Sequence, residues 1–324
     1  MQAEFFLSWP DHFSRVIVTV TIEQYDRLAH RHAQYTVQIM SRPVTNRDFL
    51  ARLQNVMGMD TVYAHFDIIP YMDLYLKYAL AAANAAAEEI LCYYRGDFEV
   101  ELKADQTPVT VADRRAEEII RGILLGEFPD HGFYGEEGGK EQEDADFLWL
   151  VDPIDGTKSF VGGYGMFSTQ IALMHHGRLV LGVSSAPAAG EIAWAVNGKG
   201  ALLNDSPVFV SGKTSLSDAS VSTGNLQSMA KSDQWARLGR IFAMVNRTRG
   251  YGDYYHYHRL AAGQLDAVIE SDVNILDIAA LSVIVQEAGG IFTDLEGRPP
   301  DLQTTSVLAA TPGLHATLLG MLNE

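Results

Sequence analysis

The hydrophobic pattern of the chain is helical in two stretches of its first half. Between Tyr71 and Arg95, residues of high helix propensity carry apolar side chains that return every three or four positions, which predicts a long helix. A second helix is predicted over 110–128, with Asp113 near its start and Pro129 directly after it. The only cysteine, Cys92, lies in an apolar part of the first helix. We therefore expect it to be a small buried residue, and it can form no disulfide within the chain.

The pattern changes to strands after residue 146. The segment "FLWLVDPIDG" at 147–156 predicts a buried strand with acidic residues at its end, where Pro153 is expected to end the ladder because it lacks an N–H. Two β-rich runs flank His176 and Gly177 and predict a hairpin. The segment "EIAWAVNGKGALLN" predicts another hairpin around the turn at 197–198.

Short strands and helices alternate in the last third of the chain. Strands are predicted at "DASVSTGN", "AVIES", "IFTDL" and "SVLAAT", and helices at "SMAKSDQWARLGRIFAMV", "YHYHRLAAGQL" and "ILDIAALSVIVQEAG". This alternation predicts an α/β layer packed on the α+β part before it. We expect residues 1–69 to be an extension of unknown role, 70–214 an α+β part that binds metal, and 215–324 an α/β part that binds substrate. The extension holds β-rich "RVIVTVTI" and a helical candidate, "TNRDFLARLQNVM", and suggests no chemistry.

Composition and charge exclude several classes of partner. The chain has 324 residues and 47% apolar residues, which is enough for a large globular core. It has 24 basic and 41 acidic residues and a formal charge of −17, so we expect no nucleic acid and no anionic membrane as a partner. No apolar stretch approaches the roughly 18 residues of a membrane span, and the first residues resemble no targeting segment, so we expect a cytoplasmic protein.

Acidic residues stand at three places where the pattern predicts the end or start of an element. Asp152 and Asp155 follow the buried strand, Glu136 lies in the glycine-rich "FYGEEGG", and Asp277 begins an apolar helix. Taken singly, each has an ordinary explanation as a turn, a loop or a helix cap. Together they offer the oxygen ligands that hard divalent cations prefer. Directly after Asp155, Gly156 permits a tight turn into the start of a helix, and a helix start favours a bound phosphate.

These residues carry a family resemblance. "GEEGG", "DPIDGTKSF" and "LDIAALSVIVQEAGG", in this order, resemble the motifs of the inositol monophosphatase family of magnesium-dependent, lithium-sensitive phosphatases, and "KADQTPVTVADRRAEE" is similar to an upstream family segment. The resemblance covers about residues 70–324. It implies the layered αβαβα sandwich, combining α/β and α+β parts, of the inositol monophosphatase and fructose-1,6-bisphosphatase type. It also implies two or three Mg²⁺ ions, a small phosphate monoester as substrate and, often, a homodimer.

Site residues follow from the resemblance position by position. The implied metal ligands are Glu136, Asp152, the carbonyl oxygen of Ile154, Asp155 and Asp277. Asp113 would pair with Thr157 to position the attacking water, which Glu136 would help to orient, and backbone donors at Gly156 and Thr157 would hold phosphate oxygens. One Mg²⁺ would activate the water and another would stabilise the leaving alkoxide. The family usually has tryptophan before the last aspartate, where this chain has Leu276.

Within the family, "DGTKSF" resembles the histidinol-phosphate phosphatase branch, as does "RGYGDYYHYHRLAAGQLDAVIES". Asp253 and Glu270 would then pair with the ammonium or imidazole of histidinol phosphate. The segment "MFSTQIAL" departs from this branch, which often has Phe-Gly-Thr-Leu there. The alternatives are a phosphatase for inositol 1-phosphate or another polyol phosphate, a 3'(2'),5'-bisphosphate nucleotidase, and a metal- or anion-binding protein without turnover.

Overall fold

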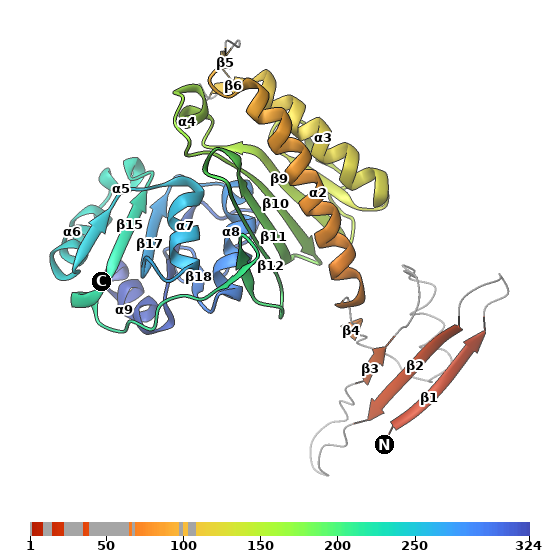
Figure 1. Ribbon diagram of the computed structural model, residues 1–324. Coiled ribbons are helices and arrows are strands. Elements are labelled where there is room, and N and C mark those ends of the chain that lie inside the picture. The colour runs from red at the N-terminus through yellow and green to blue at the C-terminus, as the bar shows by residue number, and fades with distance from the viewer. Residues whose placement is uncertain are drawn as a thin grey trace. The chain divides into compact units, whose positions relative to one another are not determined.

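The computed structural model describes the backbone of residues 2–8, 15–22, 35–38, 65–66, 69–96, 100–102 and 108–324, and the side chains of 71–96 and 110–324 (Figure 1). The chain divides into two compact units, Met1–Asp73 and Leu74–Glu324. The division of the second unit near residue 215 into a metal-binding and a substrate-binding part stays a prediction.

The first unit contains a four-stranded sheet in the order β1-β2-β3-β4. Its strands are β1 Gln2–Ser8, β2 Arg15–Ile22, β3 Tyr35–Gln38 and β4 His65–Phe66. The segment "RVIVTVTI" forms β2, as its β-branched residues indicate. The helix predicted at "TNRDFLARLQNVM" lies outside the described residues.

Both helices predicted in the first half are present. α2 spans Ile69–Tyr93, and α3 spans Val111–Glu127 after the short strands β5 Val100–Leu102 and β6 Pro108–Thr110. Thr110 caps α3 by accepting a hydrogen bond from the backbone N–H of Ala112, and Asp113 completes a capping box. The cap explains why the helix begins where it does.

The expected burial of Cys92 is wrong. Its position near the end of α2 is exposed, and its thiol donates a hydrogen bond to the carbonyl oxygen of Glu88, 3.3 Å away. The buried face of α2 ends with Ile90, and Leu91, which lies between Ile90 and Cys92, is 44% exposed. Apolar sequence neighbours were a poor guide to burial at the last turn of this helix.

The larger sheet has eight strands in the order β14-β13-β12-β11-β10-β9-β7-β8. Apart from the parallel pair β7 and β9, its neighbours are antiparallel. Both predicted hairpins are present, at β10–β11 and at β12–β13. The strands are β7 Gly132–Gly135, β8 Gly139–Glu141, β9 Phe147–Asp155, β10 Ser168–His175, β11 Arg178–Ala186, β12 Glu191–Val196, β13 Ala201–Leu203 and β14 Ser206–Val208.

Pro153 does not end β9. The strand continues to Asp155, which pairs with Ser168 of β10, and the register shifts beside the proline. The irregularity accommodates the missing N–H, as at a β-bulge. Thr169 donates a side-chain hydrogen bond to the carbonyl oxygen of Pro153 at 2.8 Å. The strand end with the acidic residues is therefore attached to the sheet.

The smaller sheet has five strands in the order β16-β15-β17-β19-β18. Its strands are β15 Ser220–Gly224, β16 Arg247–Arg249, β17 Ala267–Ser271, β18 Ile291–Thr293 and β19 Ser306–Ala310. The helices around it are α5 Gln227–Ala230, α6 Gln234–Met244, α7 Asp253–Ala261, α8 Ile275–Glu287 and α9 Pro312–Asn323. The helix predicted over 228–245 is two helices, because Ser232 bonds to the carbonyl of Met229 and to the N–H of Gln234 and so interrupts the helical ladder.

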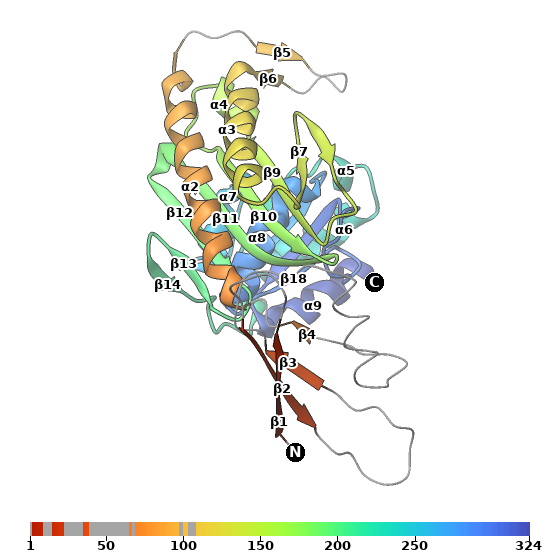
Figure 2. The same cartoon turned by 90° about the vertical axis from the view of Figure 1, so that its right-hand side faces the viewer.

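The second unit is a layered αβαβα sandwich, as the resemblance implies (Figures 1 and 2). α2 and α3 lie on one face of the larger sheet, and α7 and α8 lie between the two sheets. α6 and α9 cover the far face of the smaller sheet. Alternate residues of β17 show the layering, since Val268 belongs to the core with α8 while Ala267 and Ile269 belong to the core with α6 and α9. Among the described helices, none is long and apolar enough to cross a membrane.

Candidate active site

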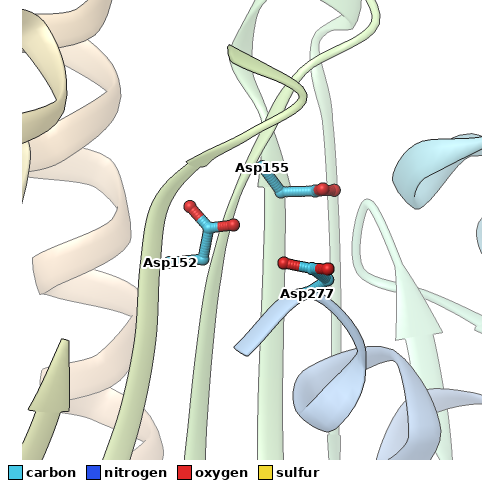
Figure 3. A group of neighbouring side chains, drawn as sticks. All are labelled: Asp152, Asp155 and Asp277. Carbon is cyan, nitrogen blue, oxygen red and sulfur yellow. The ribbon is translucent and has the colours of Figure 1, made fainter. Parts of the chain in front are cut away.

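Three aspartates meet where the end of β9 faces the start of α8 (Figure 3). Asp152, Asp155 and Asp277 each offer a carboxylate oxygen, and these oxygens lie within 4.8 Å of one another. Asp152 and Asp155 are 2% and 8% exposed. The fold thus brings together three of the four acidic residues that the sequence analysis singled out, with Asp277 coming from a distant part of the chain.

Local hydrogen bonds hold each carboxylate. The N–H of Ile154 donates to Asp152 Oδ1 at 2.9 Å, and Ser168 Oγ donates to Asp155 Oδ2 at 3.1 Å. Asp277 is the third helical residue of α8, and its two oxygens accept from the N–H and the side-chain amide of Asn274 at 2.9 and 2.7 Å. Asn274 is the N-cap, so the capping function expected of Asp277 is shared in a capping box.

The electrostatics of this group favour a bound cation. Burial, followed by the charges of neighbouring acids, raises the pKa of Asp152 and of Asp155 well above the ordinary value. Burial also raises the pKa of Asp277 to about 7, against the hydrogen bonds from Asn274. Among the described residues, no Lys or Arg forms an ion pair with the three. Carboxylates crowded in this way fit a hard divalent cation, which would neutralise them with oxygen ligands alone.

Glu136 lies beside this group, outside the three whose oxygens converge most closely. Its backbone N–H bonds to the carbonyl of Val151 on β9, and its side chain raises the pKa of Asp152 through charge and a hydrogen bond. The turn that carries it is held by Glu117 of α3, whose oxygens accept from the N–H groups of Glu137 and Gly138 at 2.8 and 2.6 Å. Sequence reasoning missed Glu117, although its position four residues after Asp113 placed both on one face of the helix.

Asp113 and Thr157 face each other at the edge of the site. Thr157 Oγ1 lies 3.5 Å from Asp113 Oδ1 and 3.0 Å from the carbonyl oxygen of Ile154, so its proton goes to the nearer carbonyl. Asp113 Oδ2 accepts from the backbone and the hydroxyl of Thr110, at 2.8 and 2.6 Å, while burial raises the pKa of Asp113. The Ile154 carbonyl keeps a second lone pair for another partner.

Gly156 makes the turn between β9 and the short helix α4, Thr157–Val161. Its φ of 85° lies in the left-handed region, and an added Cβ would come within 2.7 Å of the carbonyl oxygen of Met166. Glycine is therefore required here both for conformation and for space. The turn places the start of α4 next to the aspartates.

Asp253 and Glu270 lie close enough to Asp155 for their charges to raise its pKa. Burial and the charge of Glu270 raise the pKa of Asp253 to about 6. Glu270 is 2% exposed, and both of its side-chain hydrogen bonds go to Oε2: Tyr257 OH donates at 2.6 Å and His256 Nε2 lies 3.1 Å away. Sequence reasoning missed these two partners, because they lie in a run of aromatic residues in α7 whose members cannot be told apart by pattern.

Buried carboxylates gathered at a strand end and at helix starts are typical of enzymes that use divalent cations in phosphoryl chemistry. The family model described as "Inositol monophosphatase family" matches residues 72–324. The chain is 39% identical over 268 residues to a histidinol-phosphatase of Streptomyces coelicolor, covering 78% of this chain and 97% of that protein. It is 34% identical to an inositol-1-monophosphatase of Mesorhizobium japonicum, covering 69% and 85%. The solved structure of the extragenic suppressor protein suhB from Bartonella henselae matches with a TM-score of 0.71 and 31% identity, covering 78% and 99%.

The chain therefore belongs to the inositol monophosphatase family, and it is a phosphomonoesterase. The family is metal-dependent, and the three-aspartate group could hold a metal ion. A non-catalytic binding protein is thus the least fitting of the alternatives.

Proposed function

We propose that the protein is a histidinol-phosphatase that uses two or three Mg²⁺ ions. The observation that carries this choice of substrate is the pair Asp253 and Glu270. Glu270 is buried and Asp253 is half-buried, and besides burial, like-charge repulsion from both raises the pKa of Asp155. A ligand with an ammonium or imidazolium group relieves this repulsion, whereas a neutral polyol does not.

Asp152, Asp155, Asp277, Glu136 and the carbonyl of Ile154 would hold the metal. Bound there, Mg²⁺ supplies positive charge next to the phosphate and lowers the pKa of water, both of which hydrolysis of a phosphate dianion requires. The remaining work falls to the chain. Thr157, whose hydroxyl donates to the Ile154 carbonyl beside Asp113, orients the attacking water together with Glu136. The backbone N–H groups of Gly156 and Thr157 bind phosphate oxygens.

Inositol 1-phosphate is the second candidate, because the Mesorhizobium relative carries that activity in its name at 34% identity. Adenosine 3',5'-bisphosphate is a third. A cytoplasmic location and a homodimer belong to this proposal as predictions.

The test is kcat/KM with Mg²⁺ for histidinol phosphate, inositol 1-phosphate and adenosine 3',5'-bisphosphate. We expect histidinol phosphate to be preferred at least about tenfold, since one charge-assisted hydrogen bond contributes roughly 1.5–3 kcal/mol. Equal values for histidinol phosphate and inositol 1-phosphate would remove the proposed substrate and leave the phosphomonoesterase assignment in place.

Variants test the recognition step separately. Glu270→Gln should raise KM for histidinol phosphate about tenfold and leave KM for inositol 1-phosphate nearly unchanged. Glu287→Gln is a matched control, because Glu287 binds the backbone N–H groups of Gly198 and Gly200 in a loop outside the site. The same rise in KM for both substrates would argue against pairing with a cation.

A further inference from the structure

A line of buried hydrogen bonds leads from Asp155 into the larger sheet. Ser168 Oγ on β10 donates to Asp155 Oδ2 at 3.1 Å, and Gln170 Nε2 donates to Ser168 Oγ at 2.7 Å. The same amide nitrogen donates to Ser184 Oγ at 3.0 Å. Gln170 and Ser184 are cross-strand partners of β10 and β11, and Ser168 lies two residues from Gln170 on the same face of β10. The strand register thus aligns the three side chains.

The line continues into α7. His258 Nε2 lies 2.9 Å from Ser184 Oγ, and His258 Nδ1 lies 3.2 Å from Glu191 Oε2. Arg259 closes the line, because its Nη2 donates to both oxygens of Glu191 at 2.7 and 2.6 Å. The middle of the line is excluded from water, since Ser184 is 0% and His258 1% exposed.

The donors and acceptors define the direction of every bond. Burial lowers the pKa of His258 and favours the neutral ring. Because Glu191 only accepts, the neutral ring donates from Nδ1 and accepts at Nε2, and Ser184 must then be the donor to His258. Ser184 in turn accepts from Gln170, whose second amide hydrogen goes to Ser168 and leaves the Ser168 proton for Asp155. Gln170 is therefore the centre of the line and donates in both directions. With its amide reversed, Ser168 would give its proton to Gln170, and Asp155 would lose a donor.

Burying these polar side chains inside a sheet carries a desolvation cost. Their neighbours along β10 and β11 include the fully buried apolar residues Ile171 and Val183, and a polar group beside them lowers stability unless it is hydrogen-bonded. Both donors of the Gln170 amide are used, whereas its Oε1 is buried without a hydrogen-bond partner. The bonds of Ser168 and Gln170 nevertheless lead through this buried region to Asp155.

We propose that Ser168, Gln170 and Ser184 are positioning residues that fix the carboxylate of Asp155. Ser168 holds Oδ2 and restrains rotation of the carboxylate, so that Oδ1 is presented to the cation. The inference rests on the proposed function, because it assumes that Asp155 is a metal ligand.

The test compares Ser184→Ala with Ser282→Ala. Both remove a fully buried serine hydroxyl, but Ser282 donates to the carbonyl of Ala279 within α8 and has no bond to the line. Partners behind a metal ligand typically contribute 10–100-fold to metal affinity or activity, and Ser184 is two residues removed from Asp155. For Ser184→Ala we therefore expect the Mg²⁺ concentration for half-maximal activity, and the dissociation constant for Mn²⁺ measured directly, to rise about threefold to tenfold, with substrate KM unchanged.

Ser282→Ala should leave the half-maximal Mg²⁺ concentration and the Mn²⁺ dissociation constant at their wild-type levels. Ser184→Thr keeps the hydroxyl and should also show wild-type values for both. Gln170→Leu removes both amide donors and should have an effect at least as large as Ser184→Ala. Wild-type Mn²⁺ affinity in folded Ser184→Ala and Gln170→Leu, or an equal loss in Ser282→Ala, would overturn the inference. Because Mn²⁺ binding is measured without substrate, this result is distinct from a failure of the wild-type protein to hydrolyse histidinol phosphate.

Discussion

Replacing Asp155 by asparagine should abolish turnover without loss of stability. Asp155 lies within 4.8 Å of the carboxylate oxygens of Asp152 and Asp277. Two unit charges at that distance repel by about 3.5 kcal/mol at an effective dielectric constant of about 20. Protonation relieves part of this repulsion, so at pH 8 without metal we expect the variant to match the wild type or to exceed its free energy of unfolding by about 1–3 kcal/mol. Asparagine can still accept the hydrogen bond from Ser168.

The assay is urea unfolding at pH 8, in chelator and then in Mg²⁺. A ligand at one hundred times its dissociation constant stabilises the folded state by about 2.7 kcal/mol, so Mg²⁺ should stabilise the wild type by that order and the variant hardly at all. Asp266→Asn is the matched control. Asp266 is also buried but accepts from Ser211, Lys213 and Ser220, so the loss of its carboxylate should lower the free energy of unfolding by about 2 kcal/mol and leave the response to Mg²⁺ intact.

The reasoning would be refuted if the free energy of unfolding of Asp155→Asn in chelator were lower than that of the wild type by more than about 1 kcal/mol. The carboxylate of Asp155 would then stabilise the fold and would not be held there for a ligand. Stabilisation of the variant by Mg²⁺ to the wild-type extent would refute it equally.

Further predictions concern pH, the turn that carries Glu136, and the threonine that orients water. Burial raises the pKa of Asp277 from 3.8 to about 7, so the folded chain binds this proton more tightly than the unfolded chain. Without metal, the free energy of unfolding of the wild type should therefore fall by up to about 4 kcal/mol relative to that of Asp277→Asn as pH rises from 4 to 7. Urea titrations in chelator measure this difference, and a relative rise would contradict the prediction. Glu117→Gln can no longer accept from two N–H groups and should raise the Mg²⁺ requirement about tenfold, and an unchanged requirement would separate Glu117 from the metal. Thr157→Val should lower kcat about 100-fold with Mn²⁺ affinity unchanged, whereas Thr157→Ser should keep most of kcat; equal loss in both would make the role steric.

The secondary structure was largely predictable because it follows local periodicity. The hairpin at His176 and Gly177 and the helix capped at Thr110 were indicated by nearby residues alone. Predictions became wrong where the tertiary context decides. Pro153 remains within a strand because a bulge accommodates it, and Cys92 is exposed although apolar residues surround it in the sequence.

In the site, too, some features follow from local sequence and others depend on tertiary packing. Asp152 and Asp155 are close in sequence, so their proximity followed from one strand end. Asp277 meets them only because α8 packs against β10 and β11, and periodicity does not predict that packing. The family resemblance implied that Asp277 would join the other ligands, without giving the packing that brings it there. The hydrogen-bond partners of Asp155 were not predicted, for a different reason. In the sequence, Ser168 and Gln170 were noted only as a departure from a motif, and their connection to Asp155 can be recognised only when the strand register places Ser184 opposite Gln170.

Activity as a function of Mg²⁺ concentration, after exhaustive chelation, tests the central claim most directly. We expect phosphate release from histidinol phosphate to be absent in chelator, to rise saturably with added Mg²⁺, and to stay absent in Asp155→Asn at every concentration. Full phosphate release by the chelated protein, or a normal Mg²⁺ response in the variant, would contradict the account of three aspartates that converge to hold the metal.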